Sequence, residues 1–181
     1  SCDVGLEVGH EPRPGVSDLL DGQDDPRSCV VVVVADRHGP GDGSEVDPNW
    51  SPDGGSLVFG RLPPWWEVEG EGTRVVRILD LRSRAVRVLP GSEGLYSPRW
   101  SPDGRYIVAM TEDSQKLMLF DFTAQTWQEL ARISAGYPNW SRDGRYVYFN
   151  NMVPGKEIQA IRRVRISDRT VELVASLEGL P

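Results

Sequence analysis

A single short motif occurs three times in the chain, at spacings of about 40 to 50 residues. The copies are residues 49–59 (NWSPDGGSLVF), 99–109 (RWSPDGRYIVA) and 139–149 (NWSRDGRYVYF). A motif that recurs at such a period is typical of folds built from stacked copies of one supersecondary unit. The shared residues are ones that turn and pack a chain, so the repeat predicts a fold and leaves the function open.

Each copy predicts a strand, a tight turn and a second strand. Proline at the second turn position and aspartate at the third suit a type I turn, and glycine takes the left-handed conformation that closes a three-residue hairpin. The predicted turn residues are Asp53, Gly54, Asp103, Gly104, Asp143 and Gly144. We expect each pair to lie in a hairpin turn. We also expect Trp50, Trp100 and Trp140 to be substantially buried between repeats at equivalent positions.

The rest of each repeat predicts two further strands. Residues 76–81, 117–122 and 161–166 align as third strands, and 86–89, 127–130 and 171–174 align as fourth strands. The second strands are apolar at successive positions, which is typical of strands covered on both faces. Four antiparallel strands per repeat predict the blades of a β-propeller. We therefore predict an all-β fold, a partial β-propeller with three blades at about 45–90, 96–131 and 136–175.

Three blades cannot close a ring, since closed propellers have at least about four. We therefore expect an open arc that is a segment of a longer protein, with residues 30–34 as one strand of a preceding blade. The propeller region is predicted at 28–181. Residues 1–27 are rich in glycine, proline and aspartate without a sustained apolar period, and we expect an irregular or disordered lead-in there.

The repeat resembles the WD-like propeller repeat of the TolB type, whose hallmark is W-S-P-D-G followed by an apolar strand. The resemblance covers about residues 45–175 and implies a ring of six blades. A closer likeness, at 96–100, 115–122, 136–140 and 163–168, is to propeller regions of bacterial regulatory proteins that carry a winged-helix DNA-binding domain or a kinase domain. It implies a non-enzymatic module for protein interaction or ligand sensing. Alternatives are a periplasmic TolB-like envelope scaffold and the gating propeller of a serine peptidase.

Charge and hydropathy narrow the range of partners. The formal net charge is −7 with a pI of about 4.9, which argues against direct nucleic-acid binding because phosphate contacts need clustered lysine and arginine. No apolar run approaches the ~20 residues that cross a bilayer, and the longest is at 29–35. We expect the partner to be a protein or another domain of the parent chain. The compartment, periplasm or cytoplasm, is left open.

Residues with chemical potential are present but form no recognised site. They are Cys2, Cys29, His10, His38, Asp42, Glu45 and Asp47. The histidines lack a paired ligand, the acidic loop lacks the spacing of a calcium loop, and the nucleophile elbow G-x-S-x-G is absent from the sequence. We predict that the chain is not an enzyme and that it has no catalytic residues, no cofactor and no metal site.

Two departures from the repeat remain. The first spacing between motif tryptophans exceeds the second by ten residues, mostly in a loop at 60–73 that contains Trp65 and Trp66. Adjacent tryptophans on an inserted loop make it our candidate interaction loop. In the third repeat, Arg163 and Arg165 replace apolar and acidic residues of the other copies. Either the register shifts there by one residue, or one face of this blade is more polar.

Overall fold

The computed structural model describes residues 44–62, 74–151 and 160–177, all in the compact unit Pro40–Pro181. The described residues form twelve strands in three four-stranded antiparallel sheets and no helix, so the all-β prediction is confirmed. No helix able to cross a membrane occurs among them. The predicted lead-in at 1–27 and the predicted strand at 30–34 lie outside the described residues.

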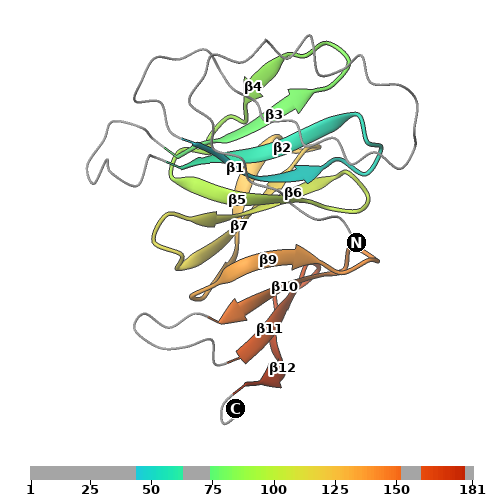
Figure 1. Cartoon of the computed structure of the whole chain (residues 1–181). Helices are drawn as coiled ribbons and strands as arrows, with labels where there is room; N and C mark the ends of the chain where they lie inside the picture. The colour runs from blue at the N-terminus through green and yellow to red at the C-terminus, as the bar shows by residue number, and fades with distance from the viewer. Residues whose placement is uncertain (1–43, 63–73, 152–159, 178–181) are drawn as a thin grey trace. The chain divides into compact units, whose positions relative to one another are not determined.

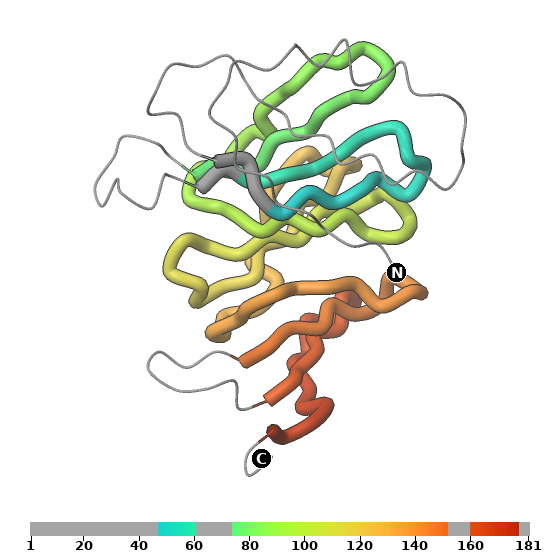
Figure 2. The backbone as a smooth tube through the Cα atoms, in the orientation of Figure 1, coloured from blue at the N-terminus to red at the C-terminus, as the bar shows by residue number. Residues whose placement is uncertain are grey.

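Each sheet is made from four consecutive strands, and we call the sheets blades 1 to 3 (Figures 1 and 2). Blade 1 contains β1 (Ser44–Trp50), β2 (Ser56–Leu62), β3 (Val76–Asp80) and β4 (Val86–Val88). Blade 2 contains β5 (Leu95–Trp100), β6 (Tyr106–Thr111), β7 (Lys116–Asp121) and β8 (Thr126–Arg132). Blade 3 contains β9 (Gly136–Trp140), β10 (Tyr146–Asn151), β11 (Ala160–Arg165) and β12 (Val171–Ser176).

The blades pack face to face through two apolar clusters. The first joins blade 1 to blade 2 and contains Val58, Val76, Ile78, Leu89, Leu95, Ile107, Ala109 and Phe120. The second joins blade 2 to blade 3 and contains Val108, Met110, Leu117, Leu119, Leu130, Ala131, Ala135, Val147, Phe149 and Val164. Successive residues of a strand point to opposite faces. Blade 2 therefore has apolar residues on both faces of β6, which explains the continuous apolar run in its sequence.

The first strands of the three blades lie next to one another. β5 contacts both β1 and β9, so these strands form the common side at which the blades meet (Figure 1). Hydrogen bonds also cross between blades here. The Trp100 amide donates to the Asn49 side chain at 2.7 Å, and the Trp140 indole N–H donates to the Arg99 carbonyl at 3.0 Å. The motif residues flanking each turn therefore connect neighbouring repeats.

The predicted hairpin turns are confirmed, and the motif serine proves to hold them together. In blade 2, the Ser101 hydroxyl donates to the Asp103 carboxylate at 2.6 Å and accepts from the Tyr106 amide at 2.8 Å. The same carboxylate accepts from the Arg105 amide at 3.0 Å. Equivalent bonds occur in blade 1 from Ser51 and in blade 3 from Ser141. Asp and Ser side chains commonly satisfy turn amides in this way.

The expectation that all three motif tryptophans are substantially buried is wrong. Trp50 is 48% exposed, and Trp100 and Trp140 are only partly buried. Trp100 packs on the cluster between blades 1 and 2 and stacks on Phe122, whereas Trp140 packs on the cluster between blades 2 and 3. Each of these two tryptophans therefore borders the core between its own blade and the preceding blade. Among the described residues, no sheet precedes blade 1, so Trp50 has no such core beside it.

We expect Gly104→Ala to destabilise the protein more than Gly54→Ala does. Both glycines have positive φ, at 74° and 71°, so either alanine costs about 1–2 kcal/mol of left-handed strain. A Cβ at residue 104 would also lie 3.3 Å from the Pro52 side chain of the neighbouring turn, whereas residue 54 has open space. Gly104→Val should cost roughly 1–3 kcal/mol. Urea denaturation midpoints measure all three, and equal midpoints for the two alanine variants would contradict the turn contact.

Candidate functional site

Each first strand contains one irregular residue, directly before a proline. Asp47, Ser97 and Tyr137 have φ values of 55°, 52° and 52°. The pairing with the second strand shifts at the same place in every blade, as in a β-bulge. Non-glycine residues rarely adopt positive φ, and each such residue costs on the order of 1–3 kcal/mol. The same strained conformation is therefore built three times, with a different side chain at each site.

These irregular residues surround one cavity, which we call the rim pocket. Its volume is about 240 Å³, and its lining residues are Asp47, Tyr96, Ser97, Met110, Ser114, Gly136 and Tyr137. All three blades contribute to it. Bulges re-aim side chains out of the regular alternation of a strand. Sequence reasoning missed this site, although the signal was present as a proline two residues before each motif tryptophan.

Several polar groups of the rim pocket already have partners within the chain. The Tyr96 hydroxyl and the Ser114 hydroxyl lie 2.5 Å apart, and the Arg74 guanidinium lies over the Tyr96 ring, 5.0 Å from its centroid. The Asp47 carboxylate lies 3.4 Å from an Arg99 nitrogen. Tyr137 is 68% exposed. The pocket thus combines one loosely paired carboxylate, hydroxyl groups and an exposed aromatic ring.

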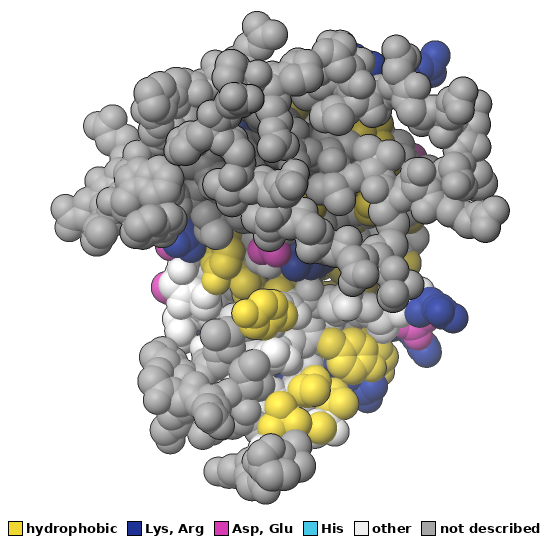
Figure 3. All heavy atoms as spheres, in the orientation of Figure 1, with side chains coloured by type: hydrophobic (Ala, Val, Ile, Leu, Met, Phe, Trp, Pro, Cys, Tyr) yellow, Lys and Arg dark blue, Asp and Glu magenta, His cyan; other side chains and the backbone are white. Residues whose placement is uncertain are grey.

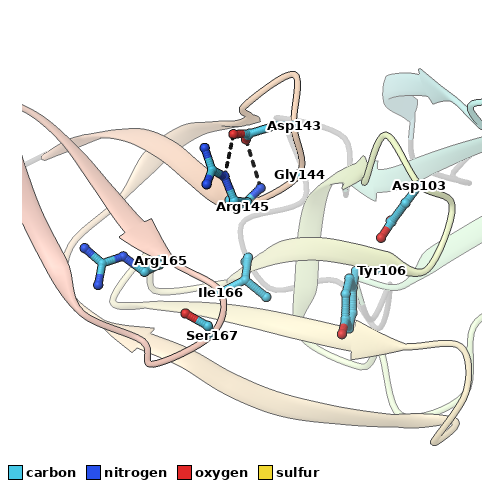
Figure 4. Close-up of a pocket in the computed structure, with 8 residues that line it drawn as sticks. All are labelled: Asp103, Tyr106, Asp143, Gly144, Arg145, Arg165, Ile166 and Ser167. Atoms are coloured by element: carbon cyan, nitrogen blue, oxygen red, sulfur yellow. Dashed lines mark hydrogen bonds and ion pairs between the residues drawn. The ribbon is translucent and has the colours of Figure 1, made fainter.

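A second cavity, which we call the turn pocket, lies between the motif turns of blades 2 and 3. Its volume is about 410 Å³, and Figure 4 shows its lining residues: Asp103, Tyr106, Asp143, Gly144, Arg145, Arg165, Ile166 and Ser167. Its charges are paired. Arg145 lies 2.6 Å from the Asp143 carboxylate, and Arg165 lies 2.8 Å from the carboxylate of Asp168 beside the pocket. The cations here are therefore occupied by carboxylates of their own blade.

Two of the turn carboxylates, Asp53 and Asp143, have lowered pKa values. The Ser141 hydroxyl, followed by Arg145, lowers the pKa of Asp143 from 3.8 to about 2. The Ser51 hydroxyl and the Gly55 amide lower the pKa of Asp53 in the same manner. A general acid or base works best with a pKa near the operating pH. These aspartates therefore stabilise turns and are unsuited to proton transfer at neutral pH.

The structure decides between the two interpretations of the third repeat. β10 and β11 pair in the same register as β6 and β7, with Val147 opposite Val164 as Ile107 is opposite Phe120. The register is not shifted, so one face of blade 3 is more polar. Tyr148 and Arg163 occupy the places that Val108 and Leu119 have in blade 2.

The polar face of blade 3 is internally paired. Arg163 lies over the Tyr146 ring at 4.3 Å and 2.7 Å from the Glu172 carboxylate, and Arg165 binds the same carboxylate. The hydrogen bond that Arg163 donates to the Tyr148 hydroxyl, followed by its pairing with the Glu172 carboxylate, raises the pKa of Arg163 above its ordinary value. Hydrophobic side chains appear near basic ones on the described surface of blade 3 in Figure 3. On β12, the side chains of Leu173 and Val174 are exposed.

Several sequence candidates are not placed. Trp65 and Trp66 lie outside the described residues, as do Cys2, Cys29, His10, His38 and Asp42. Asp47 is described, and it lines the rim pocket beside Arg99. Within residues 44–62, 74–151 and 160–177, no group of three or more metal-ligating side chains is found.

Comparison with solved structures identifies the fold. TolB from Acinetobacter baumannii matches with a TM-score of 0.58 and 20% identity, over 75% of this chain and 33% of that chain. The β-propeller domain of the Trilobed protease from Pyrococcus furiosus matches with a TM-score of 0.56 and 16% identity, over 74% and 42%. Oligogalacturonate lyase from Vibrio parahaemolyticus matches with a TM-score of 0.54 and 14% identity, over 75% and 40%.

No family model and no curated protein matches the chain. The chain spans less than half the length of these three structural neighbours. At these identities the likeness shows the fold alone, and the neighbours include a TolB, a protease domain and a lyase. The three sheets are therefore β-propeller blades, similar to those of TolB and of other propeller proteins.

Removing the Asp143 carboxylate should destabilise the protein at neutral pH and matter less in acid. Because the folded pKa of Asp143 is lowered from 3.8 to about 2, its stabilising effect is present above the unfolded pKa and is lost as the pH falls through the folded one. The difference in denaturation midpoint between the wild type and Asp143→Asn should therefore become smaller as the pH is lowered from about 5 to about 2. A difference that stays constant over this range would contradict the assignment.

Proposed function

We propose that this chain is a non-enzymatic β-propeller module that binds a protein partner or ligand within a larger bacterial regulatory protein. The observation that supports it best is the rim pocket. Three blades repeat one strained backbone conformation there and present a different side chain from each. Strain that is retained at a cavity is commonly associated with function. Loops and strand ends on a rigid repeat scaffold are also where binding surfaces usually form.

The chemistry of the described residues favours binding over catalysis. The Asp53 and Asp143 carboxylates have pKa values below the ordinary range, with serine hydroxyls and backbone amides as partners. The motif serines donate to aspartates inside the turns, so their hydroxyls are committed to structure. A nucleophile would need a neighbouring base that takes its proton, and an ionised aspartate with a pKa of about 2 is a poor one.

The regulatory part of the proposal rests on the sequence resemblance to propeller regions that accompany winged-helix or kinase domains. The partner would then be another protein or another domain of the parent chain. The chain's net charge of −7 supports a protein partner over nucleic acid. The Trp65–Trp66 loop is a second proposed contact, because it is the large aromatic insertion outside the repeat.

A peptide array tests the binding proposal. The purified chain is labelled and applied to arrayed peptides of about 12 residues with random sequences, a length that can follow a strand or loop surface. We expect reproducible binding to a subset of peptides. Tyr137→Leu should reduce it, whereas Leu173→Ala, which removes an exposed apolar side chain on β12, should leave it unchanged. Binding to no peptide would overturn the proposal.

The same array tests the tryptophan loop. Replacing both Trp65 and Trp66 with alanine should weaken peptide binding and leave the thermal unfolding midpoint nearly unchanged, as expected for residues that contact a partner. A large drop in the midpoint would show that the two side chains belong to the core, and the loop would then be dropped as a contact.

A further inference from the structure

We infer that the rim pocket receives a cationic side chain, arginine or lysine, from the partner. This inference rests on the proposed binding function and specifies its chemistry. Among the described residues, the lining of the pocket contains an aspartate, two serines, two tyrosines, a methionine and a glycine, and no basic residue. Such a set offers hydrogen-bond acceptors and aromatic faces, which are the groups that guanidinium and ammonium ions prefer.

The Asp47 carboxylate is the group that would bind the cation. Its contact with Arg99 is long, at 3.4 Å, and the Asp47 side chain remains 43% exposed. The other terminal nitrogen of Arg99, Nη1, does not reach the carboxylate: it donates to the Pro98 carbonyl at 2.9 Å and to the Asp47 backbone carbonyl at 3.5 Å. The existing ion pair therefore satisfies Asp47 incompletely. An incoming guanidinium could make the bidentate contact that Arg99 does not make.

Tyr137 supplies the aromatic surface. Its side chain is 68% exposed, and within the described residues no ring contact or ion pair involves it. The other tyrosine of the pocket, Tyr96, already has the Arg74 guanidinium over its ring and a short contact with Ser114. Cation–π attraction therefore already occurs at this pocket within the chain itself. Tyr137 offers the same interaction to a partner.

The volume of the rim pocket and the net charge of the chain both agree with this occupant. A cavity of about 240 Å³ is smaller than the usual range for drug-sized ligands, roughly 300–1,000 Å³. It is suited to a single side chain of a larger partner. A net charge of −7 would also attract a basic segment at long range.

An NMR titration of the isotope-labelled full chain tests the inference residue by residue. The probes are the blocked tripeptide Gly-Arg-Gly and the same tripeptide with citrulline, which keeps the shape of arginine and removes its charge. We expect the arginine peptide to bind more tightly and to shift the amide signals of Ser97, Gly136 and Tyr137. Asp47→Asn and Tyr137→Leu should each weaken it by about two- to fivefold.

Glu93→Gln is the matched control, because it removes one exposed negative charge that does not line the pocket. Asp47→Asn is suitable as the test because asparagine also tolerates positive φ. Equal affinity for the two peptides would overturn the inference that the rim pocket binds a cation. The proposed binding function would be unaffected by this result, because the array experiment tests it separately. If Glu93→Gln lost as much affinity for the arginine peptide as Asp47→Asn does, the inference would also be overturned, since the attraction would then come from the overall negative charge of the chain.

Discussion

The three blades of this protein are held together by burying the faces of their sheets against one another. Blade 2 does so on both faces, with Ile107 in one cluster and Val108 in the other. One strand therefore contributes to two cores. Because the described part of the chain contains no helix that could cover a sheet, the stacking of repeats is what removes its apolar surface from water.

The blades and their turns could be predicted from the sequence, because they depend on short motifs that recur in every repeat. Proline, aspartate and glycine at fixed positions predicted the hairpins, and the structure adds the serine hydroxyl that joins Asp103 to the next strand. Tryptophan burial could not be predicted as well. The environment of Trp50 depends on what lies beside blade 1, and its local sequence is similar to that of its partly buried copies.

The candidate site was harder to predict than the fold. The rim pocket depends on left-handed residues before proline, at Asp47, Ser97 and Tyr137, where local preferences favour extended backbone. The three side chains at this position are unlike, so the proline that follows each of them is their common sequence feature. The polar face of blade 3 was visible as Arg163 and Arg165, but only the pairing of β10 with β11 distinguished a polar face from a register shift.

The polar face of blade 3 also bears on which blade can dock against it during folding. Val58 and Ile78 of blade 1 are buried against blade 2, whereas Tyr148 and Arg163 occupy the equivalent places in blade 3. An apolar sheet docked there would strip water from Arg163 and Glu172 without offering new polar partners, which is costly for buried ions. Repeat proteins are prone to pairing the wrong copies. We therefore expect the Tyr148–Arg163 face of blade 3 to disfavour docking by the wrong repeat.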